Sequence, residues 1–405
     1  MSAPVRRIYL AATGMNRGKT TTSIGLLAGL IHRGVEIGFT KPVGQRYAIV
    51  DEIPADEDAI LVRAVYGLPD SLSSMSPVHI PRGFTRAYIA GDVVDDLGAR
   101  IRTAFEAVSR GRDMVLVEGT GHAGVGAVIG LSNAEVAAML GAPAVIVSEG
   151  GVGKPIDEIV LNRALFARHG VEVVGAIVNK VDVDTHPALP ETLERGLARH
   201  GIALLGVLPF RPLLSNPTLS MLCQQLAGDL LHPGTDLDRL IERVEIGAGQ
   251  AGHVLERLGP GSLLIVPGDR EDLIQALVTL TLMGRPEGAG GPDPAMLRAA
   301  ADGRGSGRGG SGDDGVGRPA VVRPDIAGIV LTGDHEPAPR VLRSIRAADL
   351  FAYRVAEDTY RVASEVHDLL VKTHPEDREK IALIQALVAE HLDVDRVLEL
   401  ASVAI

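Results

Sequence analysis

The sequence contains no tryptophan and one cysteine, Cys223, and aromatic residues make up only 3% of its 405 residues. A lone thiol cannot form a disulfide framework or a thiolate metal cluster, and such cysteine usage is typical of a reducing cytoplasm, where we expect the protein to reside. Few aromatic side chains leave little surface on which nucleic-acid bases could stack, and the net charge of −11 also disfavours nucleic acid and anionic membranes as partners. No apolar stretch is long enough to span a membrane, and the first apolar run is too short for a secretory signal.

Lysine is also scarce, because only six of the 40 basic residues are lysines and the rest are arginines. The chain therefore uses arginine for ordinary surface charge. Four of the six lysines, Lys19, Lys41, Lys154 and Lys180, nevertheless lie at the ends of predicted strands or in glycine-rich loops. A compact ammonium group on a thin stem suits such places better than a guanidinium group. These four lysines are candidate site residues.

Hydrophobic residues make up 46% of the chain and charged residues 22%, as in a soluble globular protein with two or three domains. Up to residue 210, apolar runs of strand length alternate with helical periodicity, which predicts an α/β fold with a mostly parallel sheet and helices on both faces. The predicted strands are Ile8–Ala12, Glu36–Lys41, Asp113–Glu118, Ala144–Ser148, Val173–Asn179 and Ala203–Leu208. The predicted helices lie near residues 19–32, 57–66, 92–109, 132–140, 155–169 and 190–199.

A domain boundary is predicted at Leu208–Pro212, so the first domain covers residues 1–212. A smaller α/β pattern follows over residues 213–284 and resumes over residues 325–392. Between these two parts, residues 285–324 are rich in glycine and arginine and have too few apolar residues to form a core. We expect this segment to be a disordered insertion in the second domain.

Residues Thr13–Thr20 lie between a predicted strand and a predicted helix, which is the context of a phosphate-binding loop. In such a loop, backbone N–H groups and the helix N-terminus face the phosphates, Lys19 reaches the β- and γ-phosphates, and Thr20 holds Mg²⁺. Thr13 stands where glycine is usual. The residues predicted to bind the nucleotide here are Gly14, Met15, Asn16, Arg17, Gly18, Lys19, Thr20 and Thr21.

A nucleotide site of this kind needs acidic metal ligands. Glu118 ends a predicted buried strand and is well placed for Mg²⁺. Lys41 ends another strand and could neutralise a transferred phosphoryl group or hold a substrate carboxylate, and Asp58 could be a second metal ligand. An acidic start of a helix is the ordinary explanation for Asp56, Glu57 and Asp58.

The tetrapeptide Asn179-Lys180-Val181-Asp182 matches the guanine-reading motif of GTPases, and it follows a predicted strand. Asp182 could accept hydrogen bonds from guanine. Asn179 alone at this place can equally recognise adenine, and on this ground we expect ATP, with GTP as the alternative. His122, in the loop after Glu118, is either a proton shuttle or a hydrogen-bonded loop residue.

Taken together, Thr13–Thr20, Lys41-Pro42-Val43, Asp58-Ala59, Val117-Glu118-Gly119 and the strand that ends in Asn179 resemble the dethiobiotin synthetase-like P-loop family. The resemblance covers about residues 5 to 210. It implies that Lys19 and Lys41 contact phosphate and act in catalysis, that Asn179 contacts the base, and that the ligands of Mg²⁺ are Thr20, Asp58 and Glu118.

The second domain resembles the DRTGG domain through Asp269-Arg270 and Thr332-Gly333, with Asp334 in place of the last glycine. A dethiobiotin synthetase-like domain followed by a DRTGG domain is the order found in the N-terminal part of long phosphotransacetylases. We do not expect acetyl transfer, because the acetyl-transfer domain of those proteins is not present in this sequence. The resemblance also implies a homo-oligomer.

Two functions remain open from the sequence. The first is a Mg²⁺-dependent, ATP-binding regulatory ATPase with slow turnover, whose DRTGG domain senses a small metabolite or binds an acyl-phosphate enzyme of central carbon metabolism. The second is a dethiobiotin synthetase-like ligase that activates a carboxylate or carbamate by γ-phosphoryl transfer. Lys19 and Thr20 serve either reaction, so the loop alone does not distinguish them.

Overall fold

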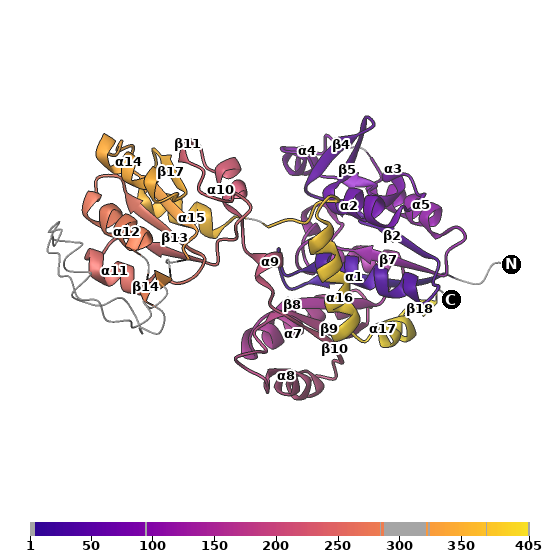
Figure 1. Cartoon of the computed structure of the whole chain (residues 1–405). Helices are drawn as coiled ribbons and strands as arrows, with labels where there is room; N and C mark the ends of the chain where they lie inside the picture. The colour runs from indigo at the N-terminus through magenta and orange to yellow at the C-terminus, as the bar shows by residue number, and fades with distance from the viewer. Residues whose placement is uncertain are drawn as a thin grey trace, which may run out of the picture. The chain divides into compact units, whose positions relative to one another are not determined.

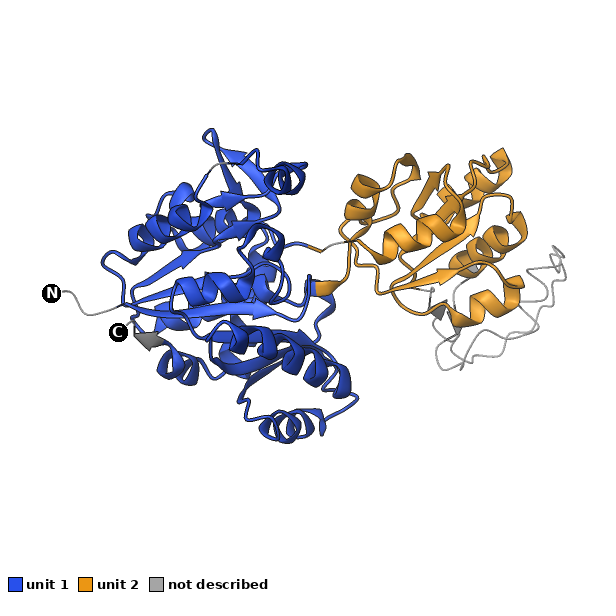
Figure 2. Ribbon diagram, turned by 180° about the vertical axis from the view of Figure 1, so that it is seen from behind, with its two compact units in different colours: residues 1–214, 372–405 blue, residues 215–371 orange. Residues whose placement is uncertain are grey.

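The structure is a computed structural model that describes residues 5–93, 95–283, 285–286, 321–322, 325–369 and 371–403. The chain forms two compact units (Figure 2). Unit 1 comprises residues 1–214 and 372–405, and unit 2 comprises residues 215–371. Among the described residues, no helix combines the length and the apolar character that crossing a bilayer requires.

Unit 1 is built on a sheet whose main path of six strands is parallel, in the order β10-β9-β8-β1-β7-β2. The short strand β18 (Ser402–Val403) pairs antiparallel with the start of β1. The main strands are β1 (Arg6–Ala12), β2 (Ile37–Thr40), β7 (Met114–Glu118), β8 (Ala144–Glu149), β9 (Val173–Val181) and β10 (Leu204–Pro209). The predicted strands and the α/β fold class are confirmed, with strand ends shifted by one or two residues.

Both faces of this sheet are covered, which explains why its strands read as nearly continuous apolar runs. Along β1, Tyr9 and Ala11 join one core, and Ile8 and Leu10 join the other. Helices α5 (Leu97–Ser109), α6 (Asn133–Met139), α7 (Gly153–Arg168) and α8 (Leu189–Ala198) contribute to the first core. Helices α1 (Lys19–His32), α2 (Glu57–Tyr66), α16 (Arg378–His391) and α17 (Val394–Leu400) contribute to the second.

Several short elements of unit 1 were not predicted, because they have too few residues for a periodic pattern. Strands β3 and β6 pair with each other, and β4 and β5 form a hairpin. These elements are β3 (Val43–Gly44), β4 (Tyr47–Val50), β5 (Ile53–Asp56), α3 (Leu72–Met75), β6 (Val78–His79), α4 (Phe84–Ala90), η1 (Ala127–Ile129) and α9 (Pro212–Ser215). The predicted helix over residues 92–109 begins only at Leu97, where Asp96 caps its N-terminus.

The C-terminal segment corrects the predicted domain boundary at residue 392. Residues 372–405 belong to unit 1, where α16 lies along α1, the helix that follows the predicted phosphate-binding loop (Figure 1). Val388 of α16 sits against Gly25 of α1, and Val394 sits against Gly29. Because these glycines have no side chain, α16 and α17 can both approach α1 closely. The segment therefore completes the core on this face of the sheet, and unit 2 is inserted within unit 1.

Unit 2 has a five-stranded sheet in the order β11-β17-β16-β13-β12, in which β11 alone is antiparallel to its neighbour. The strands are β11 (Gly228–His232), β12 (Arg243–Ile246), β13 (Ser262–Pro267), β16 (Gly328–Thr332) and β17 (Ala352–Val355). Three helices build the core on one face, and two build the core on the other. The first three are α11 (Ala251–Arg257), α12 (Glu271–Met283) and α14 (Pro339–Ala347), and the other two are α10 (Leu219–Gln225) and α15 (Thr359–His367).

The predicted disordered insertion over residues 285–324 lies outside the described residues, apart from two short strands near its ends. These strands, β14 (Arg285–Pro286) and β15 (Val321–Val322), pair antiparallel.

The contact between α16 and α1 predicts a cost for adding a methyl group to Gly25. A Cβ atom at this position would lie 2.2 Å from Cγ2 of Val388, so Gly25→Ala is expected to destabilise unit 1 by about 1–3 kcal/mol. Calorimetric melting of the full chain measures the effect. Combining Gly25→Ala with Val388→Ala should recover part of the loss, because the clashing methyl groups are removed.

Gly252 in α11 is the matched control, since a Cβ atom there meets nothing within 4 Å. Gly252→Ala should leave the melting temperature unchanged or raise it. Equal effects of the two substitutions would contradict the close packing of α16 on α1.

Candidate functional site

The predicted phosphate-binding loop turns from β1 into α1 at the centre of the unit 1 sheet. Gly18 precedes α1 with φ of 97°, and Asn16 also has a positive φ, 58°. Thr13 does not need the freedom of glycine: its N–H donates to the carbonyl of Val147 and its hydroxyl lies 3.1 Å from that of Ser148. The Lys19 ammonium curls back over the loop, 3.4 Å from the carbonyl oxygen of Gly14. The loop is thus preformed around the backbone N–H groups that would face phosphates.

The end of β9 holds this loop from the side. Asn179 Nδ2 donates to the carbonyl oxygen of Arg17 at 3.2 Å, and Lys180 Nζ donates to that of Asn16 at 2.9 Å. A Cβ atom on Gly18 would lie 1.8 Å from Asn179 Nδ2, so glycine is required at this position by space as well as by φ.

A buried cluster of charges lies on the other side of the loop. Lys41 follows β2, and its ammonium nitrogen contacts a carboxylate oxygen of Asp58, lies 3.2 Å from Glu118 Oε1 and lies 3.3 Å from Asp56 Oδ1. Glu118, at the end of β7, has no solvent-exposed surface and accepts a 2.6 Å hydrogen bond from the Ser23 hydroxyl. Five elements, β2, β5, α2, β7 and α1, bring this cluster together.

The oxygen atoms of this cluster fit a magnesium ion. The Thr20 hydroxyl lies 3.0 Å from Asp58 Oδ1 and 3.5 Å from Glu118 Oε1, so one hydroxyl and two carboxylates converge. Within the described residues, no group of three or more His, Cys, Asp or Glu side chains forms a metal site by itself. Mg²⁺ does not require one, because it is commonly held by one or two carboxylates together with water and substrate phosphates.

Burial and charge shift the protonation of the cluster. Burial raises the pKa of Glu118 to about 7, although the Lys41 charge opposes the shift. Burial also lowers the pKa of Lys19 to about 8, against the attraction of Glu118. Burial alone would lower the pKa of Lys41, but Glu118, Asp58 and Asp56 outweigh it, and the pKa is raised well above its usual value. Lys41 therefore remains charged, while Glu118 and Lys19 titrate near neutral pH.

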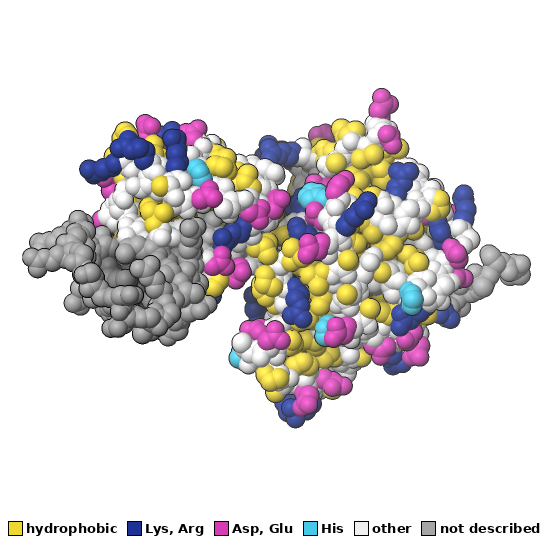
Figure 3. Space-filling model, in the orientation of Figure 1, with side chains coloured by type: hydrophobic (Ala, Val, Ile, Leu, Met, Phe, Trp, Pro, Cys, Tyr) yellow, Lys and Arg dark blue, Asp and Glu magenta, His cyan; other side chains and the backbone are white. Residues whose placement is uncertain are grey.

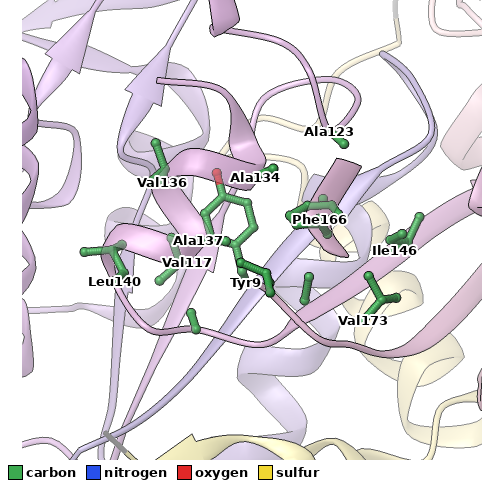
Figure 4. Close-up of a cluster of buried hydrophobic side chains, with 14 of the residues drawn as sticks. Tyr9, Val117, Ala123, Ala134, Val136, Ala137, Leu140, Ile146, Phe166 and Val173 are labelled. Carbon is green, nitrogen blue, oxygen red and sulfur yellow. The ribbon is translucent and has the colours of Figure 1, made fainter. Parts of the chain in front are cut away.

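The loop after Glu118 is fixed by Asn133 at the start of α6. Asn133 Oδ1 accepts hydrogen bonds from the Tyr9 hydroxyl at 2.8 Å and from the Thr120 N–H at 3.0 Å. Asn133 Nδ2 donates to the carbonyls of Thr120 and His122 at 2.8 and 2.7 Å. Figure 4 shows the Tyr9 ring near Phe166 within the apolar cluster and its hydroxyl directed toward the α6 residues. The small-residue loop is thus held in one conformation beside Glu118.

The remaining predicted residues are less constrained. Met15 is 53% exposed at the tip of the loop, and Thr21 is half-buried in the first turn of α1. His122 is exposed, and its Nδ1 accepts a hydrogen bond from the Gly124 N–H, as expected of a loop residue. The side chain of Lys154 is 70% exposed and lies 3.8 Å from Glu158. Neither His122 nor Lys154 joins the charged cluster.

Three residues of the site, Asp56, Ser23 and Asn133, were not predicted from the sequence to belong to it. Asp56 does cap α2, because its side chain accepts from the Asp58 N–H, but it also faces Lys41. Ser23 had a detectable signal, since it lies three residues after Thr20 and so shares a face of α1 with it. Asn133 had no detectable signal in the sequence, because its hydrogen-bond partners lie in distant parts of the chain.

In unit 2, the residues resembling the DRTGG motif lie at the carboxyl ends of β13 and β16. The Arg270 guanidinium group donates to the carbonyls of Gly247 and Gly249 and to both carboxylate oxygens of Asp272. The Thr332 hydroxyl lies 2.7 Å from that of Thr359. Asp334, which replaces a glycine, has φ of 55° and so adopts the left-handed conformation itself. The motif therefore shapes the loops at this edge of the sheet.

The parallel sheet, the loop between β1 and α1, and Lys19 define unit 1 as a P-loop NTPase-type fold. The family described as an AAA domain matches residues 6–218, and the DRTGG domain matches residues 221–369. The chain belongs to the AAA domain family, and its P-loop domain is fused to a DRTGG domain.

Relatives share both domains. The phosphate acetyltransferase of Nitrosomonas europaea is 24% identical, with 95% of this chain and 50% of the relative covered. The phosphate acetyltransferase of Pseudomonas putida is 26% identical, with 96% of this chain and 51% of the relative covered. The chain thus spans about half the length of these curated relatives. Among solved structures, the MinC:MinD cell division protein complex of Aquifex aeolicus is 15% identical, covers 52% of this chain and 83% of that chain, and has a TM-score of 0.33.

The Asn133 contacts predict a stability loss when the side chain is removed. Asn133→Ala leaves the buried Tyr9 hydroxyl and Thr120 N–H without their acceptor, which should cost about 1–3 kcal/mol in the free energy of unfolding. Tyr9→Phe keeps the backbone contacts of Asn133 and should cost less. Urea denaturation of both variants measures the difference, and an Asn133→Ala protein as stable as wild type would contradict the role assigned to this residue.

The two titrating groups predict a pH optimum for binding of a Mg²⁺-nucleotide. Below about pH 7 Glu118 takes up a proton and loses affinity for the metal, and above about pH 8 Lys19 loses the charge that attracts phosphate. We therefore expect the affinity to be highest between these two values. Titration calorimetry across pH 6 to 9 measures it. An affinity that rises steadily toward pH 6 would contradict this assignment.

Proposed function

We propose that unit 1 binds a nucleoside triphosphate together with Mg²⁺, with ATP as the expected nucleotide and GTP as the alternative. The observation that carries the proposal is the convergence of Lys19, Thr20, Asp58, Glu118 and Lys41 around the phosphate-binding loop. Basic and acidic side chains are interspersed on the face of unit 1 seen in Figure 3. Attraction of an anionic ligand is thus better explained by the local charges of the loop than by a broad basic surface.

In this proposal each residue has a separate task. The backbone of residues 14–18 cradles the phosphates, and Lys19 reaches the β- and γ-phosphates. Thr20, Asp58 and Glu118 would hold Mg²⁺, which neutralises charge on the phosphate oxygens when bound. Lys41 would face the terminal phosphoryl group from the opposite side, because it extends from β2 into the same cluster.

We further propose slow turnover with a regulatory purpose. The three carboxylates of the cluster are paired with Lys41 or directed toward the metal position, so none of them is committed to orienting an attacking water. Unit 2 would sense a small metabolite or bind a partner at the loops shaped by Arg270 and Thr332. The similarity to phosphate acetyltransferases along almost the whole chain supports a connection with acyl-phosphate metabolism.

One observation favours the alternative, a ligase that phosphorylates a carboxylate or carbamate. The loop of small residues after Glu118 is fixed by Asn133, and the Thr120 hydroxyl donates to the carbonyl of Val43, which follows Lys41 closely. A loop fixed in this way beside the phosphates would hold a carboxylate or carbamate substrate in position for attack on the γ-phosphate.

The proposal predicts that Lys19 is required for binding whereas Lys154 is not. Saturating Mg²⁺-ATP or Mg²⁺-GTP should raise the melting temperature of the wild type, since a ligand present at a hundred times its Kd stabilises by about 2.7 kcal/mol. Lys19→Ala should abolish this shift. Lys154→Ala removes a lysine that is exposed and outside the cluster, and it should retain the shift.

Phosphate release then separates the two functions. A regulatory ATPase should release phosphate slowly without any added substrate, whereas a ligase should require a carboxylate-bearing amine together with bicarbonate. Binding of neither ATP nor GTP to the wild type, or an unchanged shift in Lys19→Ala, would overturn the proposed function.

A further inference from the structure

Asp56 is a helix cap that is buried, although capping a helix does not require burial. Its Oδ1 accepts a hydrogen bond from the Asp58 N–H at 3.0 Å, and the residue is 2% exposed. The aspartates that cap three other helices, α5, α15 and α17, are exposed; these are Asp96, Asp358 and Asp393. A serine or asparagine would cap α2 about as well without a charge, whereas a buried carboxylate is costly unless it is paired. Capping alone therefore does not explain the charge at this position.

The surroundings of Asp56 hold its carboxylate in one place. Its N–H donates to Ser76 Oγ at 2.9 Å. A Cβ atom on Gly44 would lie 2.6 Å from Asp56 Oδ2, so the glycine leaves the room that the carboxylate occupies. The charged group beside this carboxylate is Lys41, whose Nζ lies 3.3 Å from Asp56 Oδ1 and whose side chain is buried. These contacts keep the carboxylate directed toward the ammonium group of Lys41.

The three carboxylates around Lys41 differ in what else they face. Asp58 Oδ1 and Glu118 Oε1 both approach the Thr20 hydroxyl, so these two carboxylates are the ones that Mg²⁺ would share. Asp56 contacts Lys41 and the start of α2 instead. Together the three carboxylates carry as much negative charge as one ammonium group and one magnesium ion carry positive charge. Asp56 therefore supplies the charge that balances Lys41 once the other two carboxylates are shared with the metal.

We propose that Asp56 is a positioning residue, which holds the ammonium group of Lys41 toward the terminal phosphoryl group while the other two carboxylates hold Mg²⁺; this inference rests on the proposed nucleotide-binding function. Without the Asp56 charge, Lys41 would be held by Asp58 and Glu118, whose attraction is reduced when they are shared with a metal ion. The ammonium group would then no longer be fixed opposite the third phosphate. Asp56 should therefore matter for binding a nucleoside triphosphate and matter little for binding a diphosphate.

The test measures binding of ATP and of ADP to the full chain at saturating Mg²⁺, by titration calorimetry, for the wild type and Asp56→Asn. GTP and GDP replace them if the wild type binds guanine nucleotides instead. Asparagine caps a helix about as well as aspartate does, and its oxygen can keep the contact with the Asp58 N–H, so the substitution removes the charge and keeps the cap. We expect the affinity for the triphosphate to fall by about tenfold, as for the loss of a contact to a charged group, and the affinity for the diphosphate to change by less than about twofold.

A double-mutant cycle shows whether Asp56 acts through Lys41. In a Lys41→Met background, adding Asp56→Asn should leave the triphosphate affinity unchanged to within about twofold, because the ammonium group that Asp56 positions is already absent. This comparison removes the two charges of the pair together, so it does not depend on a folded Asp56→Asn protein.

Asp96→Asn is the matched control, because Asp96 is an exposed aspartate that caps α5 in the same unit. It should leave both affinities at their wild-type values. An unchanged ratio of the two affinities in Asp56→Asn, or a further loss of triphosphate affinity in the Lys41→Met background, would overturn the role of Asp56 and leave the proposed function intact. A wild type that binds neither nucleotide would overturn both.

Discussion

The structure of unit 1 depends on the charge balance around Lys41. An ammonium group and three carboxylates are placed in or near the core, where an unpaired charge would cost several kcal/mol. The members come from three segments of the chain: Lys41 follows β2, Asp56 ends β5 and caps α2 while Asp58 lies in the first turn of α2, and Glu118 ends β7. The parallel pairing of β2 with β7 is what brings these groups within reach of one another. The strand order of the sheet therefore determines where the charged site forms.

The helix that carries Lys19 and Thr20 depends in turn on the end of the chain. Its outer face bears Gly25 and Gly29, and the C-terminal helices fill the space that these glycines leave. Lys372, the first residue after unit 2, contacts Glu57, which lies between the two aspartates of the charged cluster. The chain thus crosses between the two units twice, and where it re-enters unit 1 it contacts α2, the helix that carries Asp58.

Much of this arrangement could be predicted from local sequence, because strand-length apolar runs and a loop rich in small residues are local signals. The phosphate-binding loop, Lys41 and Glu118 follow from strand ends in a parallel sheet, whereas Asp58, in the first turn of α2, was indicated by the family resemblance. The place of residues 372–405 could not be predicted this way, since an amphipathic helix such as α16 does not indicate which unit it covers. The pairing of Asp56 with Lys41 was not predicted for another reason. An aspartate is also the usual residue type for capping a helix, so its cap role already explained its presence before α2.

The two sides of the phosphate-binding loop differ in a way that orients a ligand. On one side, Asp56, Asp58 and Glu118 exceed their partner Lys41 in charge, so this side favours a cation and the phosphates bridged by it. On the other side, Arg17 and Lys180 both contact Glu149 and Arg17 also lies 3.7 Å from Glu158, so the acidic groups close to the loop there are paired with basic ones and do not exceed them. In the opposite orientation, the base of a nucleotide would lie against the buried carboxylates. The terminal phosphates would then lie on the side away from the proposed metal ligands. In the proposed function, the loop would accept phosphate in either orientation, and the charges beside it would give the nucleotide a single direction.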